Sequence, residues 1–530
     1  MSESIIPDDA TVTSNEVDAG NMKTFLSGDV EAAHAVLGLV STTGSDALAP
    51  IPQFPPEIFT AIFAFHMDDY EESTPWVGIS HVCRYWRDVA LECAQLWGRI
   101  DLSYGNQWVR EMLVRAHLTP VEIYGEGDHL TISIVEFIIV HLSHIRALRL
   151  RFVSLPQGRL QMLYQGLLDS PAPIIESLSL INHHPSSLPS GLPVGVTHHA
   201  PRLRSLLLQG LGQIAWTQFS LPNIVALRII NPTMGQTHLL PLPFFDHILD
   251  FLAGLPSLES LLLKDCFPRS YEQTEPGHPG RVVDLARLQE IELIGTVSGC
   301  ARLFEHLRIP PSAHRDVSCS ITGTEDENLY PSVFSAFFNP LGGSSSAPLR
   351  AMSVMNYEPE TSLYFAVSTE SEGCVDPDWD GQARLKLVWP MRRGLMHYDL
   401  LRLAHGAIPG RGIQKLSVAT TALIWNVNDW LSCFANLDGV EELYVGYEAA
   451  DAICDALSTF VLEEGTTDWR TLTRVMDIED PRRCFFLPKL SRLVLQSACE
   501  ELAQPFATAV KARILSYFDR FSLRAGRCDL

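Results

Sequence analysis

One short pattern recurs along most of this chain and constrains its fold more than any other feature. The pattern reads apolar-x-x-apolar-x-apolar, often with a proline in front, and clear copies stand at residues 201–210, 222–231 and 256–266. Most copies lie about 21 to 35 residues apart. A pattern repeated at this interval indicates stacked structural units, each of which buries its apolar face against the next.

Each copy of the pattern has the length and composition of a short strand, and apolar residues at helical spacing lie between several copies. In residues 243–255, for example, Phe245, Ile248 and Leu249 share one face of a helix. Strand and helix in alternation predict an α/β solenoid over residues 115–530. We expect its strands within residues 118–125, 144–152, 173–182, 201–210, 222–231, 256–266, 286–295, 314–322, 348–356, 382–389, 412–419, 439–446 and 488–497.

The repeats resemble leucine-rich repeats, but they are irregular. A regular repeat of that family has an asparagine three residues after its last leucine. Here Asn182, Asn231 and Asn356 stand two residues after the last apolar position, and Cys266 stands at three. The sequence therefore predicts an irregular, leucine-rich-repeat-like solenoid with uneven curvature.

Charge and cysteine content narrow the class of protein. The formal net charge is −23, and an acidic surface repels phosphate backbones, so nucleic acid is not an expected partner. The 11 cysteines form no C-x-x-C pair, which suits a reducing compartment. We see no secretory signal and no apolar stretch long enough to span a bilayer, so we expect a cytoplasmic or nuclear protein with no membrane partner.

The first hundred residues divide into two parts. Residues 1–50 carry eight acidic residues and one lysine, and we expect this segment to be largely disordered. Residues 51–100 are instead strongly apolar, with "FPPEIFTAIF" at the start, "HVCRYWRDVA" in the middle and a final "LW". The paired prolines suit the first turn of a helix. So short a segment cannot bury all of this apolar surface alone.

These three elements, in this order, resemble an F-box, so the chain is similar to fungal F-box proteins with irregular repeats. The resemblance implies a three-helix module, at residues 51–100, that completes its core against a Skp-family adaptor. Trp86 is the expected centre of that contact. The residues that it implies for adaptor binding are Pro55, Pro56, Ile58, Phe59 and Ile62 on the first helix, and Val82, Cys83, Trp86 and Val89 on the second.

The resemblance also implies a function: the substrate receptor of an SCF-type cullin-RING E3 ubiquitin ligase. The repeats would bind a client protein, and the adaptor would link the chain to a cullin. Strand residues on the concave face are the candidates for client binding, and Leu207, Leu262 and Tyr444 look out of place in water there. Two alternatives stay open. The chain could be a scaffold without ligase activity, or its N-terminal helices could only cap the solenoid.

We find no sequence motif for catalysis. The chain has no G-x-S-x-G, H-E-x-x-H, Walker or G-x-G-x-x-G motif in a suitable context. Histidine pairs at 183–184 and 198–199 lack nearby acids or cysteines, so we do not expect a metal site. The protein is therefore expected not to be an enzyme and to need no cofactor.

Overall fold

The described part of the chain forms two compact units, one that ends at Leu150 and one that begins at Arg151. The structure is a computed structural model, and no helix in its described part is long and apolar enough to cross a membrane. The acidic segment 1–50 lies outside the described residues. These are residues 54–68, 76–152, 157–183, 199–211, 216, 221–231, 245–267, 281–320, 333–334, 337, 349–356, 362–369, 383–388, 412–420, 425–447, 449, 452–457, 486–496 and 522–525.

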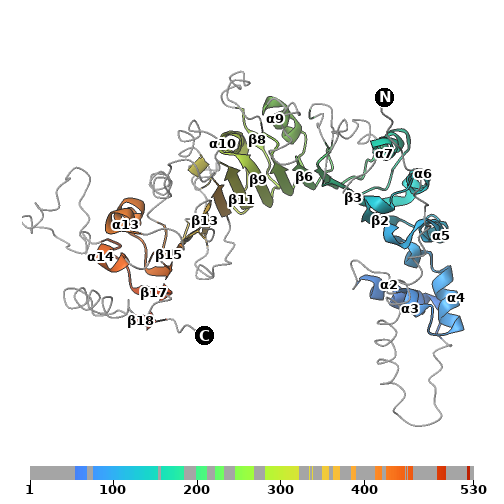
Figure 1. Cartoon of the computed structure of the whole chain (residues 1–530), viewed down its shortest axis with the longest axis horizontal. Helices are drawn as coiled ribbons and strands as arrows, with labels where there is room; N and C mark the ends of the chain where they lie inside the picture. The colour runs from blue at the N-terminus through green and yellow to red at the C-terminus, as the bar shows by residue number, and fades with distance from the viewer. Residues whose placement is uncertain are drawn as a thin grey trace, which may run out of the picture. The chain divides into compact units, whose positions relative to one another are not determined.

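The first unit begins with short helices and continues with strands and helices in alternation (Figure 1). Strands β1 and β2 are parallel and pair in register from Arg99 with Glu122 to Asp101 with Tyr124. The elements are α2 (Pro56–Asp68), α3 (Trp76–Ile79), α4 (Arg84–Glu92), the 3-10 helix η2 (Ala94–Trp97), β1 (Arg99–Asp101), η3 (Leu102–Tyr104), α5 (Asn106–Ala116), β2 (Val121–Glu126), η4 (Gly127–His129), α6 (Ile132–His141), η5 (Leu142–His144) and β3 (Ile145–Phe152), which crosses the boundary between the units.

The second unit is built on a long, mainly parallel sheet. Its helices are α7 (Gln157–Asp169), α9 (Phe245–Ala253), α10 (Val297–His306), α13 (Val427–Phe434) and α14 (Ile453–Leu457). A separate small sheet pairs β8 (Val283–Asp284) with β10 (Leu307–Arg308). In spatial order the long sheet contains β4 (Ser177–Asn182), β5 (Ser205–Gln209), β6 (Ala226–Ile230), β7 (Ser260–Lys264), β9 (Glu290–Thr296), β11 (His314–Ser320), β14 (Ala383–Val388), β13 (Ser362–Ser368), β12 (Ala351–Asn356), β15 (Lys415–Thr420), β16 (Glu442–Tyr447), β17 (Arg492–Gln496) and β18 (Ser522–Ala525).

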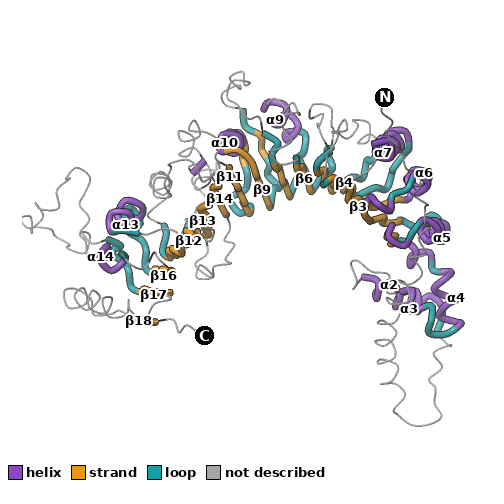
Figure 2. Tube along the Cα trace, viewed as in Figure 1, coloured by secondary structure: helices purple, strands orange, loops and turns teal. Residues whose placement is uncertain are grey.

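The core of the repeats lies on one face of this sheet. Successive side chains of a strand point to opposite faces, and in β7 Leu261 and Leu263 are buried while Leu262 is only half-buried. Figure 2 shows α9 and α10 on one side of these strands, and α10 contacts β9 and β11. The apolar face of α9, including Phe245 and Ile248, is buried as its spacing predicts.

One segment interrupts the repeat order. Strands β14, β13 and β12 stand in reverse chain order between β11 and β15, and β13 is antiparallel to both of its neighbours. The interruption is well packed, since Leu363 and Phe365 of β13 are fully buried. A series of identical parallel units would not contain such a reversal, so this is where the solenoid departs furthest from regularity.

The predicted fold class is confirmed: N-terminal helices are followed by a large, mainly parallel α/β sheet of repeated units. Every strand predicted from the repeat pattern is present, whereas β1, β8, β10, β13 and β18 were not predicted. Asn231, although it stands two residues after the last leucine-type position, still links neighbouring units. Its side chain, just after β6, donates to the carbonyl of Asp265, just after β7, at 3.1 Å. Cys266 donates to the carbonyl of Ile229 at 3.5 Å.

Candidate functional site

The candidate site begins with helix α2, which starts at the paired prolines. Pro56 is the first helical residue, a position at which the missing amide hydrogen costs nothing. The amide of Ile58 donates to the carbonyl of Pro55 at 3.0 Å, which closes the first turn. Pro55 and Pro56 are both exposed. The helix start therefore presents these two side chains at the surface, where the sequence predicted an adaptor contact.

Helix α2 carries two apolar stripes, and only one of them is covered. Phe59 and Phe63, four residues apart, are 3% and 1% exposed. Ile58, Ile62 and Phe65 occupy another face of the helix, at spacings of four and three, and are 46%, 52% and 72% exposed. We call these three residues the α2 stripe. It is the longest run of exposed large apolar side chains at helical spacing in the described part of the chain.

The covered side of α2 packs against an aromatic cluster. The ring of Trp86 lies 5.4 Å from that of Phe59 and 5.5 Å from that of Phe63, measured between centroids. Tyr85 makes an edge contact with Phe59 at 5.5 Å, and its hydroxyl donates to the carbonyl of Phe54 at 2.8 Å. Aromatic pairs in this distance range are favourable beyond the area that they bury. The cluster holds α2 against α4.

The second predicted helix is in fact interrupted. Helices α3 and α4 are separated by a turn at residues 80–83, and Cys83 is the N-cap of α4. The Cys83 thiol accepts a hydrogen bond from the amide of Trp86 at 3.4 Å. Val82 and Cys83 therefore lie in the turn, where both are exposed, and not on a helix as predicted.

The predicted adaptor residues divide into an exposed set and an internal set. Phe59 and Val89 are buried within the module, so their assignment to an open surface is corrected: they hold the helices together. Trp86 is half-buried, and its indole N–H has no hydrogen-bond partner among the described residues. The residues that remain at the surface are Pro55, Pro56, Ile58, Ile62, Val82 and Cys83.

The end of the helical module is attached to the first repeat. Leu96 and Trp97 of η2 are buried, and the guanidinium of Arg115 from α5 lies 4.7 Å from the Trp97 ring centroid. The amide of Glu122 donates to the carbonyl of Gly98 at 2.7 Å. These contacts make η2 part of the core of the first unit. The α2 stripe takes no part in them.

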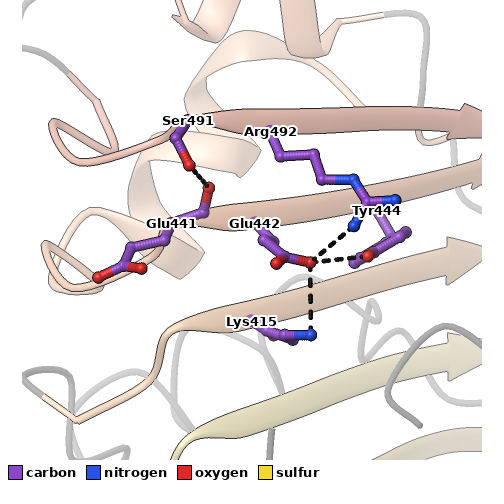
Figure 3. A network of polar contacts seen from close by, with 6 residues as sticks. All are labelled: Lys415, Glu441, Glu442, Tyr444, Ser491 and Arg492. Atoms are coloured by element: carbon purple, nitrogen blue, oxygen red, sulfur yellow. Dashed lines mark hydrogen bonds and ion pairs between the residues drawn. The ribbon is translucent and has the colours of Figure 1, made fainter. Parts of the chain in front are cut away.

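The predicted client residues fall in two environments. Leu207 and Leu262 are half-buried on the sheet face opposite the core, as expected. The expected exposure of Tyr444 is wrong, since only 7% of it is exposed. Its hydroxyl donates to the Glu442 carboxylate at 2.8 Å (Figure 3). Tyr444 is therefore packed on the sheet and held by its own chain.

Glu442 is the centre of a cross-strand network. Lys415 on β15 and Arg492 on β17 each place a nitrogen 3.4 Å from Oε2 of Glu442 (Figure 3). Burial opposes ionisation of this carboxyl, but the Tyr444 hydroxyl and the two cations outweigh burial, so its pKa is lowered. The network links three neighbouring strands, which favours a structural role.

The described residues contain no cluster of side chains suited to a metal ion. No three His, Cys, Asp or Glu side chains among them gather closely enough to hold a metal ion. Burial raises the pKa of Cys266, and a hydrogen bond with Cys319 together with burial raises that of Cys300. Both thiols are therefore protonated at neutral pH, which is the inactive form for nucleophilic attack.

Comparison with known proteins identifies the helical module. A family model described as F-box-like matches residues 51–103, so this segment forms an F-box-like domain, as the sequence predicted. No curated protein matches the chain. The chain is similar to the solved "Crystal structure of Rad7 and Elc1 complex in yeast", with 10% identity over 92% of this chain and 94% of that chain. The TM-score is 0.28, too low to bear on the fold.

Proposed function

We propose that this chain is the substrate receptor of an SCF-type cullin-RING ubiquitin ligase. The F-box-like domain would bind a Skp-family adaptor, and through it a cullin, while the repeats would bind a client protein. Such a receptor contributes no catalytic residue. It raises the concentration of the client near the enzyme that transfers ubiquitin, in the cytoplasm or the nucleus.

The α2 stripe is the observation that carries this proposal. Ile58, Ile62 and Phe65 lie at the spacing by which an amphipathic helix enters an apolar groove. Helix α2 already has a complete internal face through Phe59 and Phe63, so folding of the module does not explain a second apolar face. Pro55, at the start of the same helix, and Val82, in the turn before α4, are exposed as well. A protein that covers this surface removes its exposure to water.

The capping alternative has an observation in its favour as well. Leu96 and Trp97 of η2 are buried against the first repeat, so the module does cover one end of that core. Deletion of residues 51–100 would therefore unfold part of the chain under either hypothesis. The α2 stripe separates the two, because a cap does not need an apolar outer face. A point substitution in the stripe is the sharper test.

The test compares two isoleucines of nearly equal exposure on helices of the same unit. Ile62 in α2 is 52% exposed, and Ile132 in α6 is 57% exposed. We expect Ile62→Asp to weaken binding of a purified Skp-family adaptor by on the order of a hundredfold, because it places a charge in an apolar contact. Ile132→Asp should leave the affinity unchanged. Calorimetry on the full chain measures both.

Equal adaptor affinity of the two variants would refute the proposed interface. Loss of binding with both would indicate that unit 1 had been damaged, and circular dichroism would reveal this. The scaffold alternative is tested on the intact chain: adaptor and cullin should co-purify with it. Adaptor without cullin would favour a scaffold without ligase activity.

A further inference from the structure

The α2 stripe has a candidate partner within the same chain. Its members, Ile58, Ile62 and Phe65, are 46%, 52% and 72% exposed. The chain that precedes the module, residues 1–53, lies outside the described residues and joins the module at Phe54, two residues before α2 begins. This preceding chain is therefore tied to the start of the helix that carries the stripe.

Within the preceding chain, residues 26–40 carry one apolar face at helical spacing, and we call them the N-terminal segment. The apolar positions, at intervals of four, three, four and three, are Leu26, Val30, Ala33, Leu37 and Val40. As a helix, these 15 residues would extend about 22 Å, and the 13 residues of α2 extend about 20 Å. The segment therefore matches α2 in length and in apolar spacing.

The N-terminal segment needs a partner surface to form a stable helix. Isolated helices shorter than about 12–15 residues are marginal in water even when they are rich in alanine. Gly28 and Gly38 lie inside the run, and glycine is among the least favourable residues in a helix interior. A helix of this kind forms where its apolar face is covered, and a tighter partner displaces it readily.

The connection between the N-terminal segment and the module has a suitable length. It consists of residues 41–53, and its Ser, Thr, Gly and Pro content is typical of a connector. A coil of 13 residues has an average end-to-end distance of roughly 20 Å, close to the length of α2. Effective concentration is greatest when connector and span match, and it is then in the millimolar range. The α2 stripe is thus within reach of the segment at high local concentration.

Charge neither opposes this contact nor selects it. The N-terminal segment carries two acidic residues and no Lys or Arg. Among the described side chains of α2 and α4, the exposed charges have both signs: they are Glu57, Arg84, Arg87, Asp88 and Glu92. Burial of apolar side chains and the covalent connection therefore favour the segment as the occupant.

We propose that the N-terminal segment binds the α2 stripe in the free chain and that an adaptor must displace it. This inference rests on the proposed adaptor binding, and it adds a regulation of that surface, namely competition within the chain. With an effective concentration on the order of 1 mM and a segment Kd on the order of 0.1 mM, about nine-tenths of the molecules would be covered. The apparent adaptor affinity would then fall about tenfold.

Two leucines of the N-terminal segment give matched variants for the test. At about 100° per residue, Leu37 lies on the apolar face and Leu39 on the opposite side. In the full chain, Leu37→Asp should tighten binding of a purified Skp-family adaptor by about tenfold, because it places a charge in the apolar contact. Leu39→Asp makes the same change outside the contact and should leave the affinity unchanged. Calorimetry measures both variants and the intact chain.

A synthetic peptide with the sequence of residues 21–40 should restore the competition in the Leu37→Asp chain. At about 1 mM, the effective concentration expected of the tethered segment, it should return the adaptor affinity to that of the intact chain. The same peptide with Leu37→Asp is the control and should have no effect. Equal effects of the two peptides would overturn the inference, since the apolar face would then not be the part that binds.

Hydrogen exchange tests the contact without an adaptor. Amides of α2 should exchange more slowly in the intact chain and in Leu39→Asp than in Leu37→Asp. Equal α2 exchange in the three proteins would overturn the inference, and so would equal, measurable adaptor affinity. Protection of α5 and α6 instead of α2 would also overturn it, because the segment would then cover Val114, Leu118 and Val140, which are exposed there. Protection of α2 in a chain that binds no adaptor would reject the ligase assignment and leave the segment contact in place.

Discussion

Helices α2 and α9 are both rich in large apolar residues, but they differ in how many of these side chains are buried. In α9, Phe245, Ile248, Leu249, Phe251 and Leu252 are all buried against the repeats. In α2, Phe59 and Phe63 are buried, but Ile58, Ile62 and Phe65 face outward. A helix with one apolar face is completed by its own chain. Helix α2 has two apolar faces, and one of them is not covered by any described residue of the chain.

The same difference separates the two units more widely. Among the described residues, the exposed large apolar side chains lie between Phe54 and Val140, with Val282 as the exception. The repeats of the second unit bury their large side chains against one another, as stacked units do. Nearly all the exposed large apolar side chains of the described residues thus belong to the first unit. This difference agrees with the proposal that the adaptor surface lies in the first unit.

The largest predicted effect tests this comparison directly with two isoleucines. Ile248 in α9 is fully buried, and Ile62 in α2 is 52% exposed. Ile248→Ala should lower the free energy of unfolding by about 2–5 kcal/mol, because it leaves a cavity in the core. Ile62→Ala should change it by less than about 0.5 kcal/mol. Urea unfolding followed by circular dichroism measures both.

Hydrogen exchange would locate these effects, since faster exchange should be confined to the elements around α9 in the Ile248 variant. Adaptor binding should show the opposite order, with the Ile62 variant weakened and the Ile248 variant unchanged wherever it remains folded. Equal losses of stability would mean that α2 is covered as completely as α9, and the comparison would fail.

Much of the fold could be predicted because each repeat carries its own local signal. The leading proline, the apolar spacing and the polar turn of residues 256–266 define β7 without reference to any other part of the chain. Strand β13 could not be found in this way, since residues 359–368 do not follow the apolar repeat pattern. The order of β14, β13 and β12 depends on pairing between distant segments, which no local pattern records.

The candidate site was predicted less completely, for a geometric reason. The apolar residues of α2 cover a wide arc, and spacing alone does not say which part faces inward. Phe59 turned out to be internal because Tyr85 and Trp86 of α4 pack on it. Tyr444 turned out to be buried because its polar end has an acceptor, Glu442, within its own strand. Both outcomes depend on neighbours that only the fold brings together.

A second prediction compares helix starts in the two units. Helix α13 begins with a full capping box, in which Asn426 and Asp429 exchange two hydrogen bonds of 3.1 Å. Helix α4 has only the Cys83 thiol, a weak acceptor. Asn426→Ala should therefore lower the free energy of unfolding by about 1 kcal/mol, and Cys83→Ala should lower it by a few tenths of a kcal/mol at most.

Cys83→Ser offers the complementary change, since serine is a preferred N-cap residue. It should raise stability by about 0.5 kcal/mol while keeping the size of the side chain. Thermal unfolding measures all three variants. If Cys83→Ala lowered stability as much as Asn426→Ala, the N-cap of α4 would stabilise its helix as strongly as the capping box of α13 does. The expected difference between the two units would then be absent.

The smallest predicted effect separates two carboxylates on the sheet by their response to pH. The lowered pKa of Glu442 means that its stabilisation is present above the unfolded value, about 4.3, and is lost as pH falls through the folded value. Glu442→Gln should cost about 0.5 kcal/mol at pH 7 and nothing in acid. The raised pKa of Glu292 predicts the opposite sign, so Glu292→Gln should not destabilise at pH 7. The urea midpoints of both variants and of the intact chain, measured between pH 7 and pH 3.5, give the two stability changes. A loss on Glu292→Gln equal to that on Glu442→Gln would contradict the opposite directions of the two pKa shifts.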